Sequence, residues 1–338
     1  MTAERVTERG VIDRIRRATR GEVTDVRVGI GDDCAVLRPE PGQLLLATTD
    51  LVLEGTHFRR RYTAPADVGW KALAVNLSDI AAMGGRPRWA LVALACPSST
   101  LPGDVDAFYD GLLSLAREYD VSIVGGDTTE SASGWVVSIT LLGEAVTPIL
   151  RSTARAGDVI AVSGSLGRSA AGLAVLERNS TSAEIPGDAI ATVSAAHLRP
   201  RPRVAEARWL AAAGGVTAMM DLSDGLLIDL GHIAEESGVG ARVETARIPI
   251  DAATRRIADA LGQDAVQWAA GGGEDYELLV TCEATAFPRL SEGLEGATGL
   301  PLHRVGEIVP ASEGVAFIGH DGRPVTVTPG FEHFAIRD

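Results

Sequence analysis

Six short polar segments of this sequence combine glycine with acidic or hydroxyl residues in patterns that could bind a cation and a phosphate group together. They contain six aspartates that could face a ligand: Asp33, Asp50, Asp79, Asp127, Asp221 and Asp224. Carboxylates gathered in this number would repel one another in a metal-free site. Because Mg²⁺ binds hard oxygen ligands such as carboxylates and phosphates, we expect several magnesium ions here.

The first three of these segments lie in the N-terminal half. In residues 29–35 (GIGDDCA) the glycines would let the backbone approach a ligand, although an ordinary Asx turn is an equally good interpretation. Thr48, Thr49 and Asp50 stand at the predicted end of a hydrophobic strand, where α/β proteins gather ligands. Asp79 lies on a mostly apolar helix. An unpaired carboxylate there would be costly, which favours a metal ligand over a structural pair.

Two further residues of this half carry weaker signals. His57 follows the Thr-Thr-Asp segment by seven residues, and a histidine satisfied by its own turn is the simpler interpretation. Lys71 is the only lysine of the chain. It could contact a phosphate or pair with an acid, and the sequence leaves both open.

The other three segments follow or precede predicted strands. Residues 125–129 (GGDTT) are predicted to form a flexible turn that presents backbone N–H groups, a carboxylate and two hydroxyls. Residues 221–227 (DLSDGLL) end a strand and open a helix, where Ser223 or Asp224 could cap the helix and its N-terminus would attract an anion. The helical pattern that follows disfavours an Asp-Gly hairpin. Residues 271–277 (GGGEDYE) precede a strand, and their glycines indicate close backbone approach.

The alternation of strands and helices predicts an α/β (α+β) fold of two domains. In the first half, strands are expected at residues 26–28, 35–37, 44–49, 89–95, 121–124 and 135–142, and helices at residues 1–20, 66–83 and 105–119. In the second half, strands are expected at residues 159–162, 218–222, 276–281 and 302–309, with helices between them and an irregular tail. A polar, proline-bearing stretch at residues 147–157 separates the halves, so we place the domains at residues 1–148 and 149–338.

Composition narrows the class of partner. A formal charge of −14 over 338 residues argues against nucleic acid or an anionic membrane as the main partner. The three cysteines are far apart, and the first ten residues lack the apolar core of a signal peptide, so we expect a reduced cytoplasmic protein. The chain has no GxxxxGK[ST] loop, no HRD and DFG pair and no zinc-type grouping of His and Cys, which disfavours the commonest nucleotide-binding folds.

Taken in order, the motifs resemble the thiamine-monophosphate kinase family over nearly the whole chain. They read GIGDDCAVL, TTDLVLEGTHF, KALAVNLSDIAAMG, GGDTT, SGSLGRSAAGLAVL, HLRPRPRV, DLSDGLLIDLGHIAEESG and GGEDYELL. The resemblance places the chain in the aminoimidazole-ribonucleotide-synthetase-like superfamily. It implies an N-terminal ferredoxin-like domain, a C-terminal α/β domain and a homodimer formed through the N-terminal sheet. Selenophosphate-forming relatives are less similar, because their reactive N-terminal cysteine and lysine are absent here.

The resemblance also implies a role for each of the marked residues. Magnesium would be held by Asp33, Thr48, Thr49, Asp50, Asp79, Asp127, Asp221 and Asp224. ATP would contact Gly126, Asp127, Arg151 and Ser223, and thiamine monophosphate would contact His57, Glu274 and Phe331. Phe331 replaces a tyrosine that is frequent in the family, and its ring could still stack on a cationic heteroaromatic ring. Asp50, Asp127 and Asp224 would be the residues on which catalysis depends.

The expected activity is therefore magnesium-dependent transfer of a phosphoryl group from ATP to thiamine monophosphate. Two alternatives remain: a regulatory module that binds nucleotide without transfer, and an enzyme of the same superfamily with a different acceptor. The HLRPRPRV segment (residues 197–204) could contact phosphate, but a solvated structural link is the simpler interpretation.

Overall fold

The structure, a computed structural model, describes residues 15, 17–19, 25–28, 35–178 and 186–330. Its chain divides into two compact units, residues 1–80 with 85–147 and residues 81–84 with 148–338. The predicted helix at residues 1–20 falls largely outside the described residues. The C-terminal tail, expected to be irregular, instead contains strands at Val315–Ile318 and Pro324–Val325. None of the described helices has the length and hydrophobicity that crossing a membrane requires.

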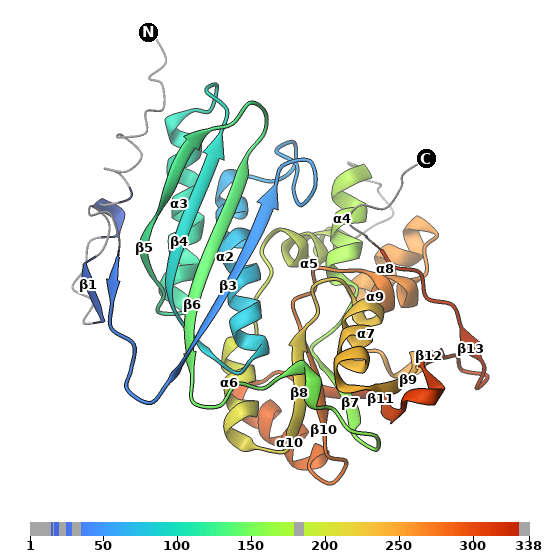
Figure 1. The fold of residues 1–338 in the computed structure, drawn as a ribbon. Helices are drawn as coiled ribbons and strands as arrows, with labels where there is room; N and C mark the ends of the chain where they lie inside the picture. Colours follow the sequence, from blue (N-terminus) through green and yellow to red (C-terminus); the bar gives the residue numbers. More distant parts are fainter. Residues whose placement is uncertain (1–14, 16, 20–24, 29–34, 179–185, 331–338) are drawn as a thin grey trace. The chain divides into compact units, whose positions relative to one another are not determined.

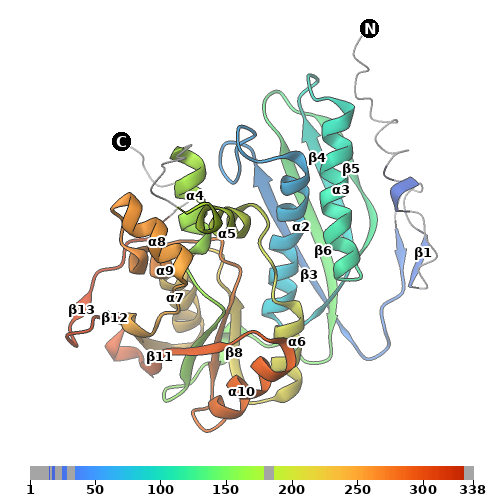
Figure 2. The ribbon, with the colours of Figure 1, turned by 180° about the vertical axis from the view of Figure 1, so that it is seen from behind.

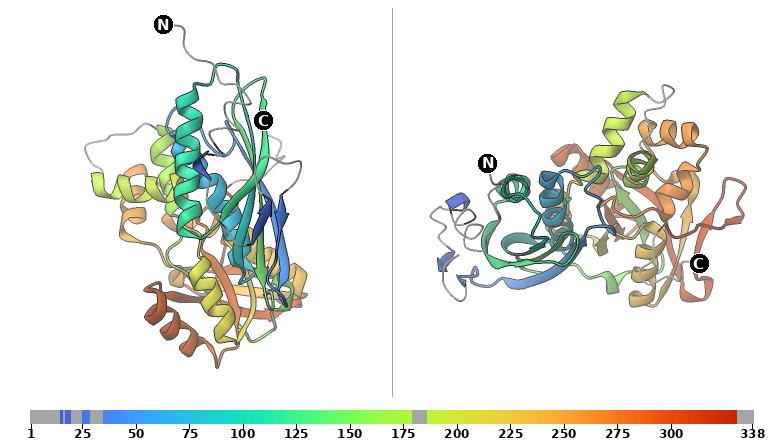
Figure 3. Two further views of the ribbon diagram at one scale, coloured as in Figure 1. Left: turned by 90° about the vertical axis from the view of Figure 1, so that its left-hand side faces the viewer. Right: turned by 90° about the horizontal axis from the view of Figure 1, so that it is seen from above.

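The N-terminal unit is a two-layer α/β structure. Its elements are β1 (Val26–Val28), β2 (Val36–Leu37), β3 (Leu44–Leu53), α2 (Pro65–Ala82), β4 (Arg86–Cys96), α3 (Pro102–Glu118), β5 (Ser122–Glu130) and β6 (Val136–Ala145). Strands β3, β6, β4 and β5 form one sheet in that order, and α2 and α3 lie on the same face of it (Figure 1, Figure 3). Among the described residues, no helix covers the opposite face of the sheet.

The strand order refines the ferredoxin-like expectation for this unit. A ferredoxin-like domain has the connectivity β-α-β-β-α-β, whereas strands β3 to β6 and their helices run β-α-β-α-β-β. The reason is the crossover through α3, because it makes β4 and β5 parallel neighbours and leaves β6 to pair antiparallel with both β3 and β4.

Two sequence-based strand ends were wrong. Strand β3 continues to Leu53, so Asp50 lies within it and not at its end. Strand β5 runs to Glu130, so GGDTT is part of a strand and not a turn. The glycines explain the second case: a Cβ on Gly126 would lie 1.9 Å from the backbone oxygen of Val92, so only glycine lets β5 pair this closely with β4.

The C-terminal unit is built around a seven-stranded sheet in the order β13-β12-β9-β11-β7-β10-β8. Its strands are β7 (Val159–Ser163), β8 (Val216–Asp221), β9 (Val239–Glu244), β10 (Leu278–Cys282), β11 (Leu302–Pro310), β12 (Val315–Ile318) and β13 (Pro324–Val325). Its helices are α4 (Arg168–Arg178), α5 (Gly187–Leu198), α6 (Val204–Ala213), α7 (Leu226–Ser237), α8 (Ala252–Leu261), α9 (Ala265–Gly271) and α10 (Phe287–Thr298). Short 3₁₀ turns are η1 (Arg151–Thr153), η2 (Thr245–Arg247) and η3 (Ala311–Glu313). Figure 2 shows these helices from the reverse side.

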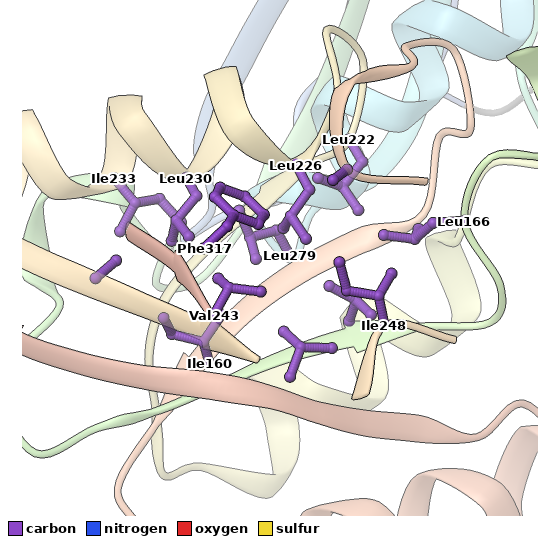
Figure 4. Packing of buried hydrophobic residues seen from close by; sticks show 14 of the residues in the cluster. Ile160, Leu166, Leu222, Leu226, Leu230, Ile233, Val243, Ile248, Leu279 and Phe317 are labelled. Atoms are coloured by element: carbon purple, nitrogen blue, oxygen red, sulfur yellow. The ribbon is translucent and has the colours of Figure 1, made fainter. Parts of the chain in front are cut away.

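The main core of this unit lies between α7 and the sheet. Helix α7 presents Leu226, Leu230 and Ile233 at helical spacing to buried strand residues such as Leu279 and Phe317 (Figure 4). All of these side chains are almost completely buried. The packing holds both ends of α7, and the residues before its first turn are therefore set in place by the core.

In the N-terminal unit, α2 and α3 cross with their backbones in direct contact. A Cβ on Gly69 of α2 would lie 2.0 Å from the backbone oxygen of Phe108, and one on Gly111 of α3 would lie 1.9 Å from that of Ala66. Each glycine thus meets the backbone of the other helix. Such close approach fixes how α2, and with it Asp79, sits on the sheet.

We expect Gly111→Ala to lower the free energy of unfolding by about 1–3 kcal/mol, because the methyl group can be accommodated only if the helices move apart. Gly103→Ala in the first turn of the same helix is the control. A Cβ there meets nothing within 4 Å, so its effect should stay within about 0.5 kcal/mol. Urea unfolding of both variants measures the difference, and equal stabilities would contradict the tight crossing.

Candidate active site

A group of oxygen ligands gathers where β3 faces α2. The Thr48 hydroxyl donates to Oδ2 of Asp79, and the backbone N–H of Asp50 donates to Oδ1 of Asn76 at 3.1 Å. Thr48 and Asp50 are two residues apart on one strand, so their side chains leave the sheet on the same face. The predicted residues Thr48, Asp50 and Asp79 are thereby brought together at the helix-covered face.

Thr49 lies on the other face of the sheet. Its hydroxyl accepts a hydrogen bond from Thr140 at 3.2 Å and lies 3.5 Å from the Ser138 hydroxyl. Both partners belong to β6. The structure therefore does not bring the Thr49 hydroxyl to the oxygen group of Thr48 and Asp79, because neighbouring residues of a strand point to opposite faces.

Asp127 stands far from Asp50 within this unit. Asp127 of β5 pairs with Ala93 of β4, which pairs with Ser138 of β6, which in turn pairs with Leu51 of β3. Asp127 therefore lies in the row of Leu51, the residue that follows Asp50. Three strand spacings of about 4.8 Å separate β3 from β5, or roughly 14 Å. One cation cannot bind both carboxylates of a single chain across that distance.

His57 is held by its own turn. Its Nδ1 accepts the backbone N–H of Leu53 at 3.0 Å. A ring nitrogen that accepts a hydrogen bond carries no proton, so the proton of the neutral ring lies on Nε2. The hydrogen bond within its own turn, expected from the sequence, is thus observed at Nδ1 of His57. The Nε2–H group is the one that could donate to a phosphate oxygen.

In the C-terminal unit, residues 221–225 and 271–277 form one paired structure. The backbone N–H groups of Glu274 and Tyr276 donate to the backbone oxygens of Ser223 and Leu222 at 2.7 and 2.9 Å. A Cβ on Gly273 would lie 2.5 Å from the backbone oxygen of Ser223. This confirms the close backbone approach predicted from the glycines, and it places Ser223 beside Glu274.

Two residues of the 271–277 segment adopt a backbone conformation that residues other than glycine disfavour. Glu274 has φ = 66° and Tyr276 has φ = 50°, although neither is glycine. Such conformations cost of order 1 kcal/mol each and persist only where surrounding contacts impose them. Here the imposing contacts are the hydrogen bonds to residues 222 and 223.

Asp229, which the sequence interpretation missed, holds the start of α7. Its Oδ2 accepts the backbone N–H groups of Asp224 and Gly225 at 3.2 and 3.0 Å. The expected cap by Ser223 or Asp224 is therefore wrong: Gly225 is the cap residue, without a side-chain bond of its own. A signal was available, since Asp229 shares the apolar spacing of Leu226 and Leu230 and must be buried with them.

Burial and neighbouring negative charge act on Asp229. Burial in the first place, and then the charges of Asp221 and Asp224, raise the pKa of the Asp229 carboxyl to about 8. Its Oδ1 is buried and has no hydrogen-bond partner among the described residues. Within the described part of the chain, no three His, Cys, Asp or Glu side chains are placed to hold a metal ion by themselves.

Arg151 lies at the other end of α7 from Ser223. Its backbone oxygen accepts a hydrogen bond from the hydroxyl of Ser237, the last residue of that helix, at 2.9 Å. Twelve helical residues rise roughly 18 Å, so the backbones of Arg151 and Ser223 lie about that far apart. The Arg151 residue is exposed. Asp33 and Phe331, the remaining predicted ligands, lie outside the described residues.

Comparison with known proteins identifies the family. Residues 31–145 match AIR synthase related protein, N-terminal domain, and residues 155–319 match AIR synthase related protein, C-terminal domain. The chain is 42% identical to thiamine-monophosphate kinase of Salmonella typhimurium over 334 residues, 97% of this chain and 98% of that protein. This chain belongs to the thiamine-monophosphate kinase family. The resemblance inferred from the motifs is thereby confirmed.

Solved structures of the thiamine-monophosphate kinase family share the two-domain α/β fold. The enzyme from Stenotrophomonas maltophilia K279a superposes with a TM-score of 0.82 at 39% identity, covering 95% of this chain and 99% of that one. AaThiL complexed with AMPPCP and TMP superposes with a TM-score of 0.77 at 32% identity, covering 99% and 100%. The predicted fold class is confirmed.

The raised pKa of Asp229 leads to a prediction for protein freed of divalent cations. The folded state holds a proton on Asp229 up to about pH 8, whereas the unfolded chain releases it near pH 4. Between these values the folded state binds more protons, so the contribution of Asp229 to the free energy of unfolding falls as the pH rises. Asp229→Asn keeps an acceptor for both N–H bonds and removes the charge.

We therefore expect Asp229→Asn to gain stability relative to the unsubstituted protein as the pH is raised from 5 to 8. Urea unfolding in EDTA across this range measures the gain. Asp110→Asn, at an exposed position of α3, should track the unsubstituted protein at every pH. A gain that is constant with pH would show that Asp229 is not held protonated.

Proposed function

We propose that this chain transfers the γ-phosphoryl group of ATP to thiamine monophosphate, forming thiamine diphosphate and ADP. The observation that carries the proposal is end-to-end similarity to proteins of this activity, together with the AaThiL complex, which holds AMPPCP, an ATP analogue, and TMP. The paired segments 221–225 and 271–277 support it, because they combine backbone donors, a helix N-terminus and carboxylates suited to a metal-bound nucleotide.

The acceptor of this reaction is a phosphate oxygen that is already ionised at neutral pH. A strong general base is therefore unnecessary, and the barrier is mainly repulsion between two anions. Magnesium, when bound, supplies charge neutralisation of both phosphate groups. The chain's own contribution is to position the reactants in line. We infer direct transfer without a phosphoenzyme.

We assign metal binding to the predicted carboxylates and hydroxyls. These are Asp33, Thr48, Asp50, Asp79, Asp127, Asp221 and Asp224; the predicted ligand Thr49 is left out, because its hydroxyl faces the other side of the sheet. Support comes from the clustering of Thr48, Asp50 and Asp79 and from the raised pKa of neighbouring Asp229. Turnover would depend most on Asp50, Asp127 and Asp224.

We assign the organic ligands to the remaining residues. ATP would contact Gly126, Asp127, Arg151 and Ser223, and thiamine monophosphate would contact His57, Glu274 and Phe331. His57 Nε2–H suits a phosphate oxygen, and the Glu274 carboxylate suits the positive charge of the thiazolium ring. In this assignment residues 1–148 bind metal and nucleotide and form the dimer, and residues 149–338 complete the nucleotide and thiamine phosphate sites.

A homodimer is also part of the proposal. The helix-free face of the N-terminal sheet exposes Leu45, Leu51 and Leu91 at 54, 47 and 37% of their surface. Apolar side chains grouped on one face of a sheet favour burial against another surface. Asp127 shares its row of the sheet with Leu51. In a dimer across this face, Asp127 would therefore lie at the interface, where it could be part of a site that both copies share.

A cytoplasmic location stays a prediction. Use of ATP fits it, and so do the two described cysteines, Cys96 and Cys282, which are both buried free thiols.

The first test incubates the purified protein with ATP, Mg²⁺ and thiamine monophosphate and follows thiamine diphosphate and ADP by chromatography. We expect equal amounts of both products and no turnover in EDTA. Bound ATP without thiamine diphosphate would instead support a different acceptor or a non-catalytic binding role.

In the same assay, Asp127→Asn should lower kcat by about 100-fold or more, because the magnesium that would neutralise the phosphates loses a carboxylate ligand. The fold should persist, since the Asp127 residue is exposed. Asp110→Asn, which removes an exposed carboxylate of the same unit, should keep full activity. A folded Asp127→Asn protein with a near-normal rate would contradict the assignment.

For the dimer, we expect Leu51→Asp to shift the mass in solution, measured by light scattering, from twice that of one chain to that of a single chain. Turnover should fall with it if the site is shared. Leu101→Asp, which alters an exposed leucine before α3, should leave both unchanged. A fully active monomer would rule out a shared site.

A further inference from the structure

The segment HLRPRPRV at residues 197–204 is not the solvated link that its sequence suggested. His197 is 3% exposed, and Pro200 and Pro202 are buried as well. The segment connects α5 to α6. Arg199 and Arg201 are exposed, whereas His197 and Arg203 turn toward the GGGEDYE segment.

His197 contacts the carboxylate assigned to thiamine monophosphate. Its Nδ1 lies 3.2 Å from Oε2 of Glu274 and 2.9 Å from the Ser169 hydroxyl. An ionised carboxylate only accepts hydrogen bonds, so the contact favours the ring with a proton on Nδ1. In that state His197 holds Oε2 of Glu274.

Arg203 anchors the other end of the same segment. Its guanidinium bonds the Glu277 carboxylate through Nε at 2.8 Å and through a second nitrogen. The Ser163 hydroxyl donates to Glu277 Oε2 and accepts the backbone N–H of Leu278 at 2.8 Å. Because Glu277 is 2% exposed, this two-point ion pair is protected from water and fixes the backbone just after Glu274.

Asp275 completes the connection. Its carboxylate accepts the backbone N–H groups of Gly167 and Ser169 at 2.6 and 3.0 Å, at the start of α4. Burial raises its pKa to about 7. Ser169, which contacts His197, is therefore itself held by Asp275, the residue that follows Glu274. The contacts between His197, Ser169, Asp275 and Glu274 thus form a closed loop.

We propose that residues 197–203 are a positioning element for the Glu274 carboxylate, with His197 setting its orientation toward the positive charge of thiamine monophosphate. Glu274 is strained at φ = 66°, so its side chain keeps one orientation only while contacts on both sides hold it. This inference rests on the proposed function, since it assumes that Glu274 binds that substrate. It assigns His197 no contact with substrate.

The proposal predicts a selective effect on one substrate. Without the Nδ1 contact, Glu274 must be ordered by the substrate itself, and that ordering reduces affinity. His197→Gln moves the amide beyond the position of Nδ1, and it should raise KM for thiamine monophosphate roughly tenfold. KM for ATP and kcat should stay within about twofold. His197→Asn places an amide where Nδ1 stood, and it should restore KM to within about threefold.

Two controls separate positioning from a structural role. His232→Gln, at an exposed histidine of α7, should change nothing. In a Glu274→Gln background, His197→Gln should add no further increase in KM for thiamine monophosphate, because the two residues act as one unit. If His197→Gln does not fold, Ser169→Ala serves in its place, with a rise of about threefold expected.

The outcomes distinguish this inference from the proposed function. An unsubstituted protein that neither binds nor converts thiamine monophosphate would overturn both. An active protein in which His197→Gln leaves KM for thiamine monophosphate unchanged, or raises KM for ATP equally, would overturn the positioning role alone. So would additive effects of the two substitutions in the double variant.

Discussion

Concentrated negative charge is the constraint on which the arrangement of this protein depends. Asp221, Asp224 and Asp229 lie so close that burial and their mutual repulsion raise the pKa of Asp229 to about 8. A structure that keeps such a group together must hold it by contacts strong enough to oppose the repulsion. The contacts observed are the backbone hydrogen bonds to Asp229 and the packing of α7. Neither of these contacts uses a positively charged side chain.

Glycine supplies the close contacts that this constraint requires. In the C-terminal unit, Gly225 and Gly273 let two loops pair through their backbones, so the carboxylates between them have little freedom to separate. In the N-terminal unit, Gly126 lets β5 lie against β4, and the Gly69–Gly111 crossing sets α2 on the sheet. Glycine therefore helps to position acidic residues in both units. Because glycine has no side chain, it lets two backbones come together, and a fixed backbone places a carboxylate more firmly than contacts of flexible side chains would.

Buried ion pairs form the layer behind the acidic residues. Arg203 and Glu277 hold the strained segment that contains Glu274, and Asp275 ties it to α4. Partners buried in this way are costly to separate, because either one left alone would be an uncompensated charge. The rigidity that orients the Glu274 carboxylate, which we assign to the substrate, thus comes from residues that need not touch the substrate.

The sequence alone determined the family, the two-domain α/β class and most strands and helices, because hydrophobic periodicity and glycine-acid motifs are local signals. It also indicated that residues 221–227 end a strand and open a helix. Tertiary structure decided what local signals do not encode: that GGDTT pairs as a strand, that Thr49 faces away from Thr48, and that Asp229 caps its own helix from within. The contacts of residues 197–203 show why. Arg203 and Glu277 are 74 residues apart, and Gly167 and Asp275 are 108 apart. Such partners meet only when the whole unit folds, so no pattern within a short window specifies them.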